Sequence, residues 1–398
     1  MNEKYSKGSS QERILTVYFA LERFIGLFCE SGTKWNYGGA EMQMYYLARS
    51  FAALPGVQVV LLTSKPDLTS IYPGISIRQI KKYPRTGNII GRLRQKHVPG
   101  PIVWLAEKYI ERSNMRRRHN LFEEHTGRSV MLISSFERTD VVRAASLHGI
   151  KVVYRVSGDS LVDGTYAPEV ITRIRTDQLF DLSDAVVVQS EYQQRAFQEN
   201  YNRDATIIAS GFSWSDPLQG PRKKQVLWVG RCVAIKRPWL LLALAHRLPQ
   251  ADFAFIAPPP DDELFLEMER EACKLDNVTL IPGVARSEIT RYYAESAVVV
   301  NTSFSEGMPN TLIEACAAET PYVSYSLDIG GLLGEEGIGD CAQGDMERFV
   351  ELVDQYLDSD ERRAEVGKKA YEYARRTWNI QTATDSYIEL FSELLRAG

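Results

Sequence analysis

The sequence predicts an α/β fold in which two parallel sheets, each covered by helices on both faces, follow one another along the chain. Short runs of β-branched and aliphatic residues recur, and most are continuously apolar, as expected for parallel strands that are buried on both faces. Helical patterns separate these runs, and the alternation of strand and helix is typical of doubly wound sheets. A length of 398 residues accommodates two such domains.

The predicted strands form two series, which a polar stretch separates. The first series covers residues 14–20, 57–63, 130–134, 151–156, 185–189 and 206–209. The second series covers residues 225–230, 252–257, 277–282, 297–301 and 321–325. Helical patterns lie between the strands at 40–51, 168–182, 237–248, 262–275, 288–295 and 310–318, and three polar helices close the chain at 345–358, 360–377 and 382–395.

The stretch 213–224 carries two prolines, a glycine and three basic residues, which is typical of a linker between domains. We therefore predict a first Rossmann-like domain over 1–215, a second over 216–380, and a final helix over 381–398 that crosses back to the first domain. Because ligands of doubly wound sheets bind outside the carboxyl ends of the strands, two such domains that face each other leave a ligand-binding cleft between them.

The composition is that of an ordinary globular protein, with 44% hydrophobic and 25% charged residues. The five cysteines are scattered without a CxxC pair, which argues against a zinc site and against a disulfide framework. The N-terminus is polar and has no apolar signal core, and no apolar run approaches the ~18 residues of a membrane span. We therefore expect a cytoplasmic protein, either free or peripheral at the inner face of the cell membrane, with no nucleic-acid partner.

Charge is distributed unevenly, although the net charge is only −4. Basic residues exceed acidic ones up to residue 220, and acidic residues exceed basic ones after it. The segment 83–125 is basic and contains a short apolar core at 102–105. Because an amphipathic basic segment can lie on an anionic membrane, residues 85–119 are predicted to contact one. The alternative is a helix pair that packs on its own domain and presents its charges to water.

The segment 304–322 has the strongest functional pattern. A buried strand runs into a loop with Glu306 and Gly307, and a helix follows from Asn310, which is a favourable N-cap residue. Gly307 lets a ligand approach the backbone closely, and the loop amides with the helix N-terminus favour an anion or a hydroxyl. Glu314 lies just over one helical turn past Asn310, so both carboxylates are predicted to point into one cleft, where they suit sugar hydroxyls. Alternatively, Glu306 is only a charge at a helix start and Glu314 a solvated helix residue.

A second pattern follows the predicted strand 225–230. Gly230 ends this strand, and Arg231 and Lys236 follow as a helix begins. Two cations at the carboxyl end of a strand suit a diphosphate, which gains negative charge when it departs as a leaving group. The alternative is a pair of surface cations at a helix start, where positive charge is mildly unfavourable.

A third pattern is the pair Gly38 and Gly39, which opens the helix predicted at 40–51. A Gly-Gly turn before a helix can face a phosphate or an acceptor. The pair is not part of a GxGxxG motif, which disfavours a dinucleotide-dependent oxidoreductase. The long connection before it, 21–37, is predicted to form a flap that contacts the acceptor.

Together these patterns resemble glycosyltransferase family 4. The family's two-glutamate motif, E-G followed by E-A, is matched at Glu306, Gly307, Glu314, Ala315, Ala317 and Pro321, and its GR-x-x-x-x-K element at Gly230, Arg231 and Lys236. Glu319 and Arg237 stand where glycine is common in the family. The resemblance implies the two-domain GT-B fold and a retaining transfer from a UDP-sugar or a GDP-sugar.

The resemblance also implies which residues hold the donor. Arg231 and Lys236 would bind the pyrophosphate, Glu306 and its loop would hold the sugar, and Glu314 would bind the ribose. The full set predicted for the donor is Gly38, Gly39, Gly230, Arg231, Lys236, Glu306, Gly307, Met308, Pro309, Asn310 and Glu314. By the same resemblance, the first domain binds the acceptor and the second binds the nucleotide-sugar.

The first domain departs from the family near the reacting sugar. After the strand 151–156 the family often has a histidine, whereas this chain has Ser157, Gly158 and Asp159. Either Asp159 or Ser157 substitutes for the histidine, or the role is missing, and the alternative for Asp159 is a turn residue. The catalytic residues predicted are therefore Arg231, Lys236, Glu306 and Asp159.

The predicted function is transfer of a hexose to a glycan or lipid-linked acceptor, in the synthesis of cell-surface polysaccharide or glycoconjugates. No metal and no cofactor are expected, because the triplet Asp358-Ser359-Asp360 has the pattern of a helix cap. Two alternatives stay open. One is a nucleotide-sugar epimerase or a phosphorylase on the same fold, and the other is a protein that binds a nucleotide-sugar without catalysis.

Overall fold

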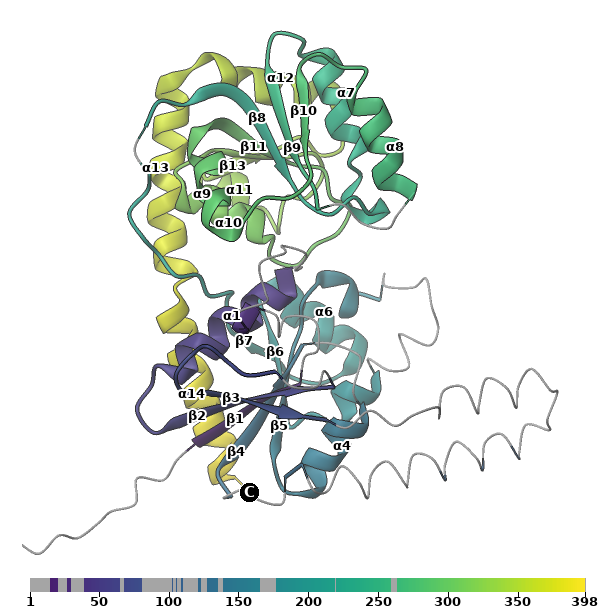
Figure 1. Cartoon of the computed structure of the whole chain (residues 1–398), viewed down its shortest axis with the longest axis vertical. Coiled ribbons are helices and arrows are strands. Elements are labelled where there is room, and N and C mark those ends of the chain that lie inside the picture. Colours follow the sequence, from purple (N-terminus) through teal and green to yellow (C-terminus); the bar gives the residue numbers. More distant parts are fainter. Residues whose placement is uncertain are drawn as a thin grey trace, which may run out of the picture.

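The computed structural model describes residues 15–20, 27–29, 39–64, 68–80, 102, 105, 109, 121–122, 127–134, 139–164, 177–218, 220–258 and 263–397. Within this part of the chain, the strands form two separate parallel sheets, which lie one above the other in Figure 1. The predicted α/β class, with two doubly wound sheets, is confirmed.

The first sheet has the strand order β3-β2-β1-β4-β5-β6-β7. Its strands are β1 (Leu15–Ala20), β2 (Val57–Thr63), β3 (Ile75–Gln79), β4 (Ser129–Ile133), β5 (Lys151–Arg155), β6 (Ala185–Val188) and β7 (Thr206–Ile207). The side chains of β1 alternate between two buried layers, with Val17 and Phe19 in one and Tyr18 and Ala20 in the other. Helices therefore cover both faces, which explains why the strands are continuously apolar.

The second sheet has the strand order β10-β9-β8-β11-β12-β13. Its strands are β8 (Lys223–Val229), β9 (Asp252–Ile256), β10 (Val278–Ile281), β11 (Ser296–Asn301), β12 (Tyr322–Ser324) and β13 (Gly339–Cys341). One face packs against α7 (Trp239–Arg247), α8 (Glu263–Ala272) and α12 (Met346–Asp358). The other face packs against α9 (Arg286–Glu295), α10 (Asn310–Ala317) and α13 (Asp360–Thr377).

The last two helices belong to different sheets. Helix α13 lies along the second sheet, and α14 (Ile380–Arg396) lies beside α1 (Gly39–Ala52) on the first sheet (Figure 1). Tyr387 and Phe391 of α14 are buried, and the Phe391 ring lies 5.6 Å from that of Phe51. The chain therefore passes between the sheets twice, and an isolated bridge between Phe212 and Asn379 joins the two passages.

Several elements were absent from the sequence-based prediction. Strand β3 is a partly exposed edge strand that alternates apolar and polar residues, and β13 has only three residues. Neither therefore contains a continuous apolar run. Three helices were missed as well: α4 (Thr139–Leu147), α6 (Glu191–Tyr201) and α11 (Leu332–Glu335). Most of the helix predicted at 168–182 lies outside the described residues, as do nearly all of the flap at 21–37 and of the basic segment 85–119.

No helix in the described part of the chain is both long enough and apolar enough to cross a membrane.

Candidate active site

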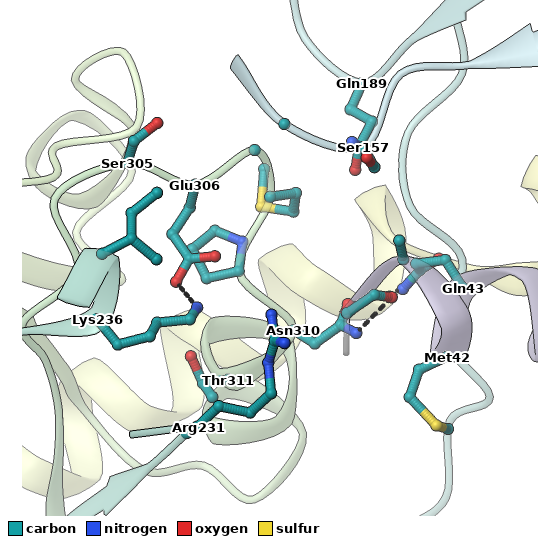
Figure 2. Close-up of a pocket in the computed structure, with 18 of the residues that line it drawn as sticks. Met42, Gln43, Ser157, Gln189, Arg231, Lys236, Ser305, Glu306, Asn310 and Thr311 are labelled. Atoms are coloured by element: carbon teal, nitrogen blue, oxygen red, sulfur yellow. Dashed lines mark hydrogen bonds and ion pairs between the residues drawn. The ribbon is translucent and has the colours of Figure 1, made fainter. Parts of the chain in front are cut away.

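A cavity of about 380 Å³ lies between the two sheets. We call each sheet with the helices that pack on it a unit. The first unit contributes the start of α1 and the residues after β5 to the cavity wall, and the second unit contributes the residues after β8 and the β11–α10 loop. Figure 2 shows Gln43, Ser157 and Gln189 across the cavity from Arg231, Lys236 and Glu306. The predicted donor residues that line it are Gly39, Gly230, Arg231, Lys236, Glu306, Gly307, Met308, Pro309, Asn310 and Glu314. Gly38 lies outside the described residues.

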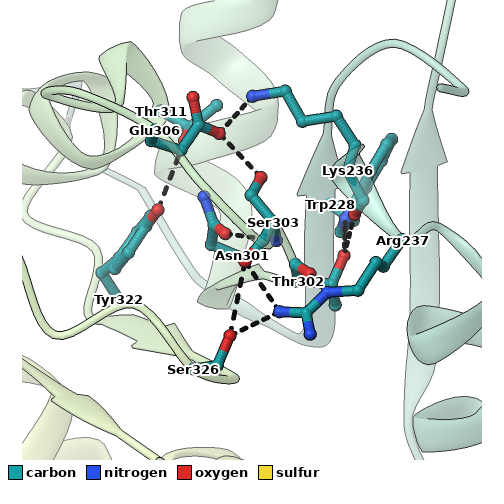
Figure 3. A network of polar contacts seen from close by, with 10 residues as sticks. All are labelled: Trp228, Lys236, Arg237, Asn301, Thr302, Ser303, Glu306, Thr311, Tyr322 and Ser326. Atoms are coloured by element: carbon teal, nitrogen blue, oxygen red, sulfur yellow. Dashed lines mark hydrogen bonds and ion pairs between the residues drawn. The ribbon is translucent and has the colours of Figure 1, made fainter. Parts of the chain in front are cut away.

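The two predicted phosphate ligands differ in their surroundings. Arg231 follows β8 after Gly230, and its exposed side chain lines the cavity. Lys236 ends a short 3₁₀ turn (Ala234–Lys236), and its ammonium group forms an ion pair with Oε1 of Glu306. Ser303 Oγ donates to the same carboxylate oxygen over 2.7 Å (Figure 3). Lys236 and Glu306 thus hold each other at the cavity wall, with side chains only 24% and 17% exposed.

The turn after Lys236 explains one departure from the glycine pattern. Arg237 has φ of 45°, a left-handed conformation that favours glycine. Its guanidinium group donates to the carbonyl oxygens of Thr302 and Ser303 over 2.7 and 2.8 Å, and it also bonds Ser326 Oγ (Figure 3). These contacts tie the Lys236 turn to the end of β11. The arginine therefore compensates for the backbone conformation with bonds that glycine cannot make.

Glu319 is the second departure from glycine and shows the same backbone feature. Its φ is 54°, so the turn between α10 and β12 keeps a left-handed residue without glycine. Arg222 secures this turn, since its guanidinium group donates to the carbonyl oxygens of Ala318 and Glu319, both over 2.9 Å, and to Thr320 Oγ1 over 2.7 Å. The turn itself is therefore preserved.

The loop of Gly307 lies directly against the first unit. A Cβ atom at Gly307 would lie 3.0 Å from the carbonyl oxygen of Ser157 and 3.1 Å from Cα of Gly158, which is tighter than ordinary contacts. The backbone amide of Asp159 donates to the carbonyl of Glu306 over 3.4 Å. Glycine therefore favours the close approach of one unit to the other at this position.

Asn310 does not cap its helix, which corrects the sequence-based prediction. It is the first residue of α10, and the cap position is Pro309, without a side-chain cap bond. The Asn310 amide instead reaches across the cavity, where its Oδ1 accepts from Gln43 Nε2 and its Nδ2 donates to the Gly39 carbonyl, both over 3.0 Å. The other end of the Gln43 amide accepts from the Gly211 backbone over 3.0 Å. The Asn310 side chain therefore joins the start of α10 to the start of α1.

Glu314 lies on α10 and lines the same cavity as Glu306. Its Oε2 accepts a hydrogen bond of 2.8 Å from the Tyr293 hydroxyl, which belongs to α9. The tyrosine fixes the carboxylate on the cavity wall, and a carboxylate has further lone pairs with which to accept hydrogen bonds from a ligand.

Asp159 lines a second cavity instead of the first. This cavity, of about 180 Å³, lies where the 306–308 loop meets the start of α6. Oδ1 of Asp159 accepts from Gln193 Nε2 over 2.8 Å. Burial raises the pKa of Asp159 to about 6, and the neighbouring carboxylates of Asp163 and Glu306 add to the increase, while the Gln193 bond opposes it. Asp159 is thus near the 306–308 loop but on its other side.

Arg155 is a cavity residue that the sequence-based prediction missed. It ends β5 and is only 2% exposed, and Nη2 donates to Gln189 Oε1 and to Ser210 Oγ, both over 3.0 Å. Burial lowers the pKa of its guanidinium group, which nevertheless stays charged at any physiological pH. It therefore adds a third positive charge to the wall of the larger cavity.

Residues 215–373 match the model of a known family, glycosyl transferases group 1. The D-inositol 3-phosphate glycosyltransferase of Mycobacterium sp. (strain KMS) is 23% identical over 73% of this chain and 71% of its own length. That of Kineococcus radiotolerans is 24% identical over 74% of each chain. The chain is a glycosyltransferase.

Solved structures support the same fold. Sucrose-phosphate synthase from Thermosynechococcus elongatus superposes with a TM-score of 0.76 and 16% identity, covering 96% of this chain and 100% of that one. TarM of S. aureus, solved with UDP and a GlcNAc-glycerol ligand, gives a TM-score of 0.71 at 11% identity, with 95% and 100% covered. Anabaena HepE, solved with UDP and glucose, gives 0.69 at 14% identity, with 95% and 100% covered. The glycosyltransferase thus has the GT-B fold of two Rossmann-like units.

The sequence patterns of the glycosyltransferase lie mostly in its second unit. Gln43, Gln189 and Gln193 line the cavities, and Ser303 bonds the Glu306 carboxylate. Each is a single polar residue that belongs to no recognisable sequence pattern. Ser359 caps α13 by accepting from the Arg362 amide, as predicted from the Asp-x-Asp triplet. Among the described residues, no group of three His, Cys, Asp or Glu side chains is arranged to hold a metal ion.

Proposed function

We propose that this enzyme is a retaining glycosyltransferase that moves a hexose from a UDP-sugar or a GDP-sugar to a hydroxyl of a glycan or lipid-linked acceptor. One observation carries the proposal. A single cavity between the two units is lined by Arg231, Lys236, Glu306 and Glu314, which are the residues predicted to hold the diphosphate, the sugar and the ribose.

The positive side of this cavity suits the leaving group. When the bond between the anomeric carbon and the phosphate oxygen breaks, the nucleoside diphosphate gains negative charge. Arg231 and Lys236 would offset this charge from the wall of the cavity. Lys236 forms an ion pair with Glu306, so a bound diphosphate would share this ammonium group with the carboxylate.

The negative side suits the hydroxyls of the donor. Glu306 and the backbone amides of Gly307 and Met308 would hold the transferred sugar, and Glu314 would accept from the adjacent hydroxyls of the ribose. The bond from Tyr293 keeps the Glu314 carboxylate in place before the nucleotide arrives.

In the transfer, the acceptor oxygen would bond the anomeric carbon and its proton would pass to the departing phosphate oxygen, so that no covalent enzyme intermediate is formed.

Solved structures of the same fold bear on the base of the nucleotide. HepE was solved with UDP-glucose and with UDP, and TarM with UDP, which supports uridine. The residues that line the cavity are compatible with either base, so GDP-sugars are kept in the proposal.

We also propose that the enzyme works at an anionic membrane surface. Ile102, Leu105 and Tyr109 have exposed fractions of 52%, 60% and 77%, and their i, i+3, i+7 spacing places them on one side of a helix. The sequence around them is rich in Lys and Arg, which attract anionic lipids.

Co-sedimentation with phosphatidylglycerol liposomes should fall when Arg116, Arg117 and Arg118 are replaced by Ala. Absence of binding by the wild type would reject the membrane role.

The donor proposal is tested in two steps. Thermal unfolding is measured with UDP, GDP and ADP and with their sugars, because a ligand that binds the native state raises Tm. Release of the selected nucleotide is then followed with a mixture of glycan acceptors. We expect acceptor-dependent release and a product with retained anomeric configuration.

An epimerised sugar formed without acceptor would identify an epimerase, and sugar phosphate formed from a glycan and phosphate would identify a phosphorylase. Binding with no turnover under any acceptor would leave a binding protein.

A further inference from the structure

The second cavity shares its wall with the larger one. Gln189, Glu306, Gly307 and Met308 line both cavities, so the 306–308 loop separates two spaces that adjoin. If the donor sugar lies against one side of this loop, a molecule in the second cavity lies against the other side of it. Both units contribute to the second cavity, since Ser190 and Gln193 belong to the first unit and Leu327 and Ile329 to the second.

The two cavities differ sharply in charge. Among the described residues, the larger cavity has Arg155, Arg231 and Lys236 in its wall, whereas no Lys, Arg or His lines the second. The charged residues of the second cavity are Asp159 and Glu306, and Asp163 lies close enough to Asp159 to raise its pKa. Glu306 is paired with Lys236, whereas the Asp159 carboxylate is bonded only to the neutral Gln193 among the described residues, so an anionic ligand would meet the Asp159 carboxylate without a counter-charge, which is costly in a partly desolvated space.

The remaining lining suits a sugar ring. Leu327, Ile329 and Met308 provide an apolar surface, and the polar groups of Asp159, Ser190 and Gln193 stand around it. Oδ2 of Asp159 accepts no hydrogen bond from the residues that the structure describes, so it is available to a ligand hydroxyl. A volume of about 180 Å³ is below the ~300–1,000 Å³ of sites for drug-sized ligands, and it therefore suits a single ring.

We infer that the second cavity is the acceptor subsite, and that it takes an uncharged or amine-bearing sugar unit and excludes phosphorylated and carboxylated ones. The inference rests on the proposed function, because it places a sugar unit of the acceptor on the opposite side of the loop that would hold the donor sugar. Asp159 positions the acceptor through one of its hydroxyls, and the apolar surface contacts the C–H face of the ring.

The experiment uses the full chain loaded with whichever of UDP and GDP raises its Tm. Saturation-transfer NMR measures binding of monosaccharides in the gluco, galacto and manno series, each as the neutral sugar, the amino sugar, the uronic acid and the 6-phosphate. We expect binding of neutral or amino sugars and at least tenfold weaker binding of the uronic acids and phosphates. Equal binding of an anionic sugar, or binding of none, would overturn the inference.

Two variants place the ligand in this cavity. Leu327→Trp fills the space and Asp159→Asn removes the charge while keeping a group of the same shape, so both should weaken sugar binding at least fivefold. The matched control is Glu191→Gln, which removes an exposed charge next to Ser190 but outside both cavities.

Nucleotide affinity of the same variants, measured by calorimetry, should stay within about twofold of the wild type. Sugar binding unchanged in both variants would contradict the acceptor assignment even when nucleotide binding is intact. Loss of nucleotide binding by the wild type would instead contradict the donor proposal.

Discussion

The two cavities on either side of the 306–308 loop differ in their charge and in the origin of their residues. The larger one gathers positive charge, and most of its predicted ligands come from two short stretches, 230–236 and 306–314. The smaller one is acidic, and its residues come from the segments after β5, β6 and β12, from the start of α6 and from the 306–308 loop. One loop thus separates a space suited to a diphosphate from a space suited to an uncharged sugar.

Removal of the positive charge should have the largest effect. Replacing Arg231 and Lys236 together by Ala should lower kcat by ~10²–10³ or more, since a single lost contact to a developing oxyanion has this cost. Steady-state kinetics with the best donor measures it, with Lys274→Ala as the exposed control. A near-normal kcat would remove the diphosphate role and with it the contrast between the cavities.

The ribose role of Glu314 should produce the next largest effect. Glu314→Ala removes a charged acceptor of two hydrogen bonds, so nucleotide affinity should fall about 10- to 100-fold, on the ~1.5–3 kcal/mol scale of bonds to charged groups. Calorimetry with UDP or GDP gives this number. Tyr293→Phe removes only the group that fixes the carboxylate and should weaken binding less. Unchanged affinity in Glu314→Ala would exclude the ribose role.

Asp159 should reduce stability at neutral pH. Its pKa is about 6 in the folded enzyme and near its ordinary value of 3.8 in the unfolded chain, so folding favours the protonated form. This contribution to stability is fully present below pH ~4 and is lost as the pH rises through ~6. Asp159→Asn should therefore be more stable than the wild type at pH 7.5, by about 1–2 kcal/mol after allowance for partial exposure.

The difference should shrink as the pH is lowered toward 4. Urea unfolding of both proteins at pH 7.5, 6 and 4.5 measures it. Because Asp163, Glu306 and Tyr192 also face or adjoin this group, Asp163→Asn should show a smaller gain of the same sign. A constant difference between the proteins across this pH range would contradict the assigned burial of Asp159.

The smallest effect concerns the turn after α10. Glu319 has a left-handed backbone, so Glu319→Gly should keep or raise the free energy of unfolding, by up to about 1 kcal/mol. Glu336 is the matched control, because its φ of −89° gives glycine no such advantage. Destabilisation of Glu319→Gly as large as that of Glu336→Gly would show that the Glu319 side chain, and not Arg222, maintains this turn.

The fold class was predictable from the sequence, and most of the residues predicted to bind the donor line one cavity. Parallel strands that are buried on both faces leave continuous apolar runs, whereas β3, at the edge of its sheet, alternates and gave no signal. Gly230, Arg231 and Glu306 follow strand ends, where the chain itself brings ligands to the carboxyl edge of a sheet.

Other features depend on contacts between distant residues. The Asn310 amide binds Gln43, 267 positions away, instead of capping α10, and no local pattern indicates such a contact. The left-handed residues Arg237 and Glu319 are likewise not recognisable by residue type. In the first turn Arg237 itself donates to carbonyl oxygens, and in the second turn Arg222 does so. These bonds become visible only in the folded chain.

The return of α14 to the first sheet limits how this enzyme can be divided. Tyr387, Leu390 and Phe391 of α14 cover Val17, Phe19 and Phe51, so a fragment that ends near residue 215 would present this apolar layer to water. The first sheet, α1 and α14 thus share one apolar layer, which is made of two separated pieces of chain. A chimaera that exchanges the donor half between glycosyltransferases of this kind should therefore exchange only the intervening segment and keep both ends from the same parent.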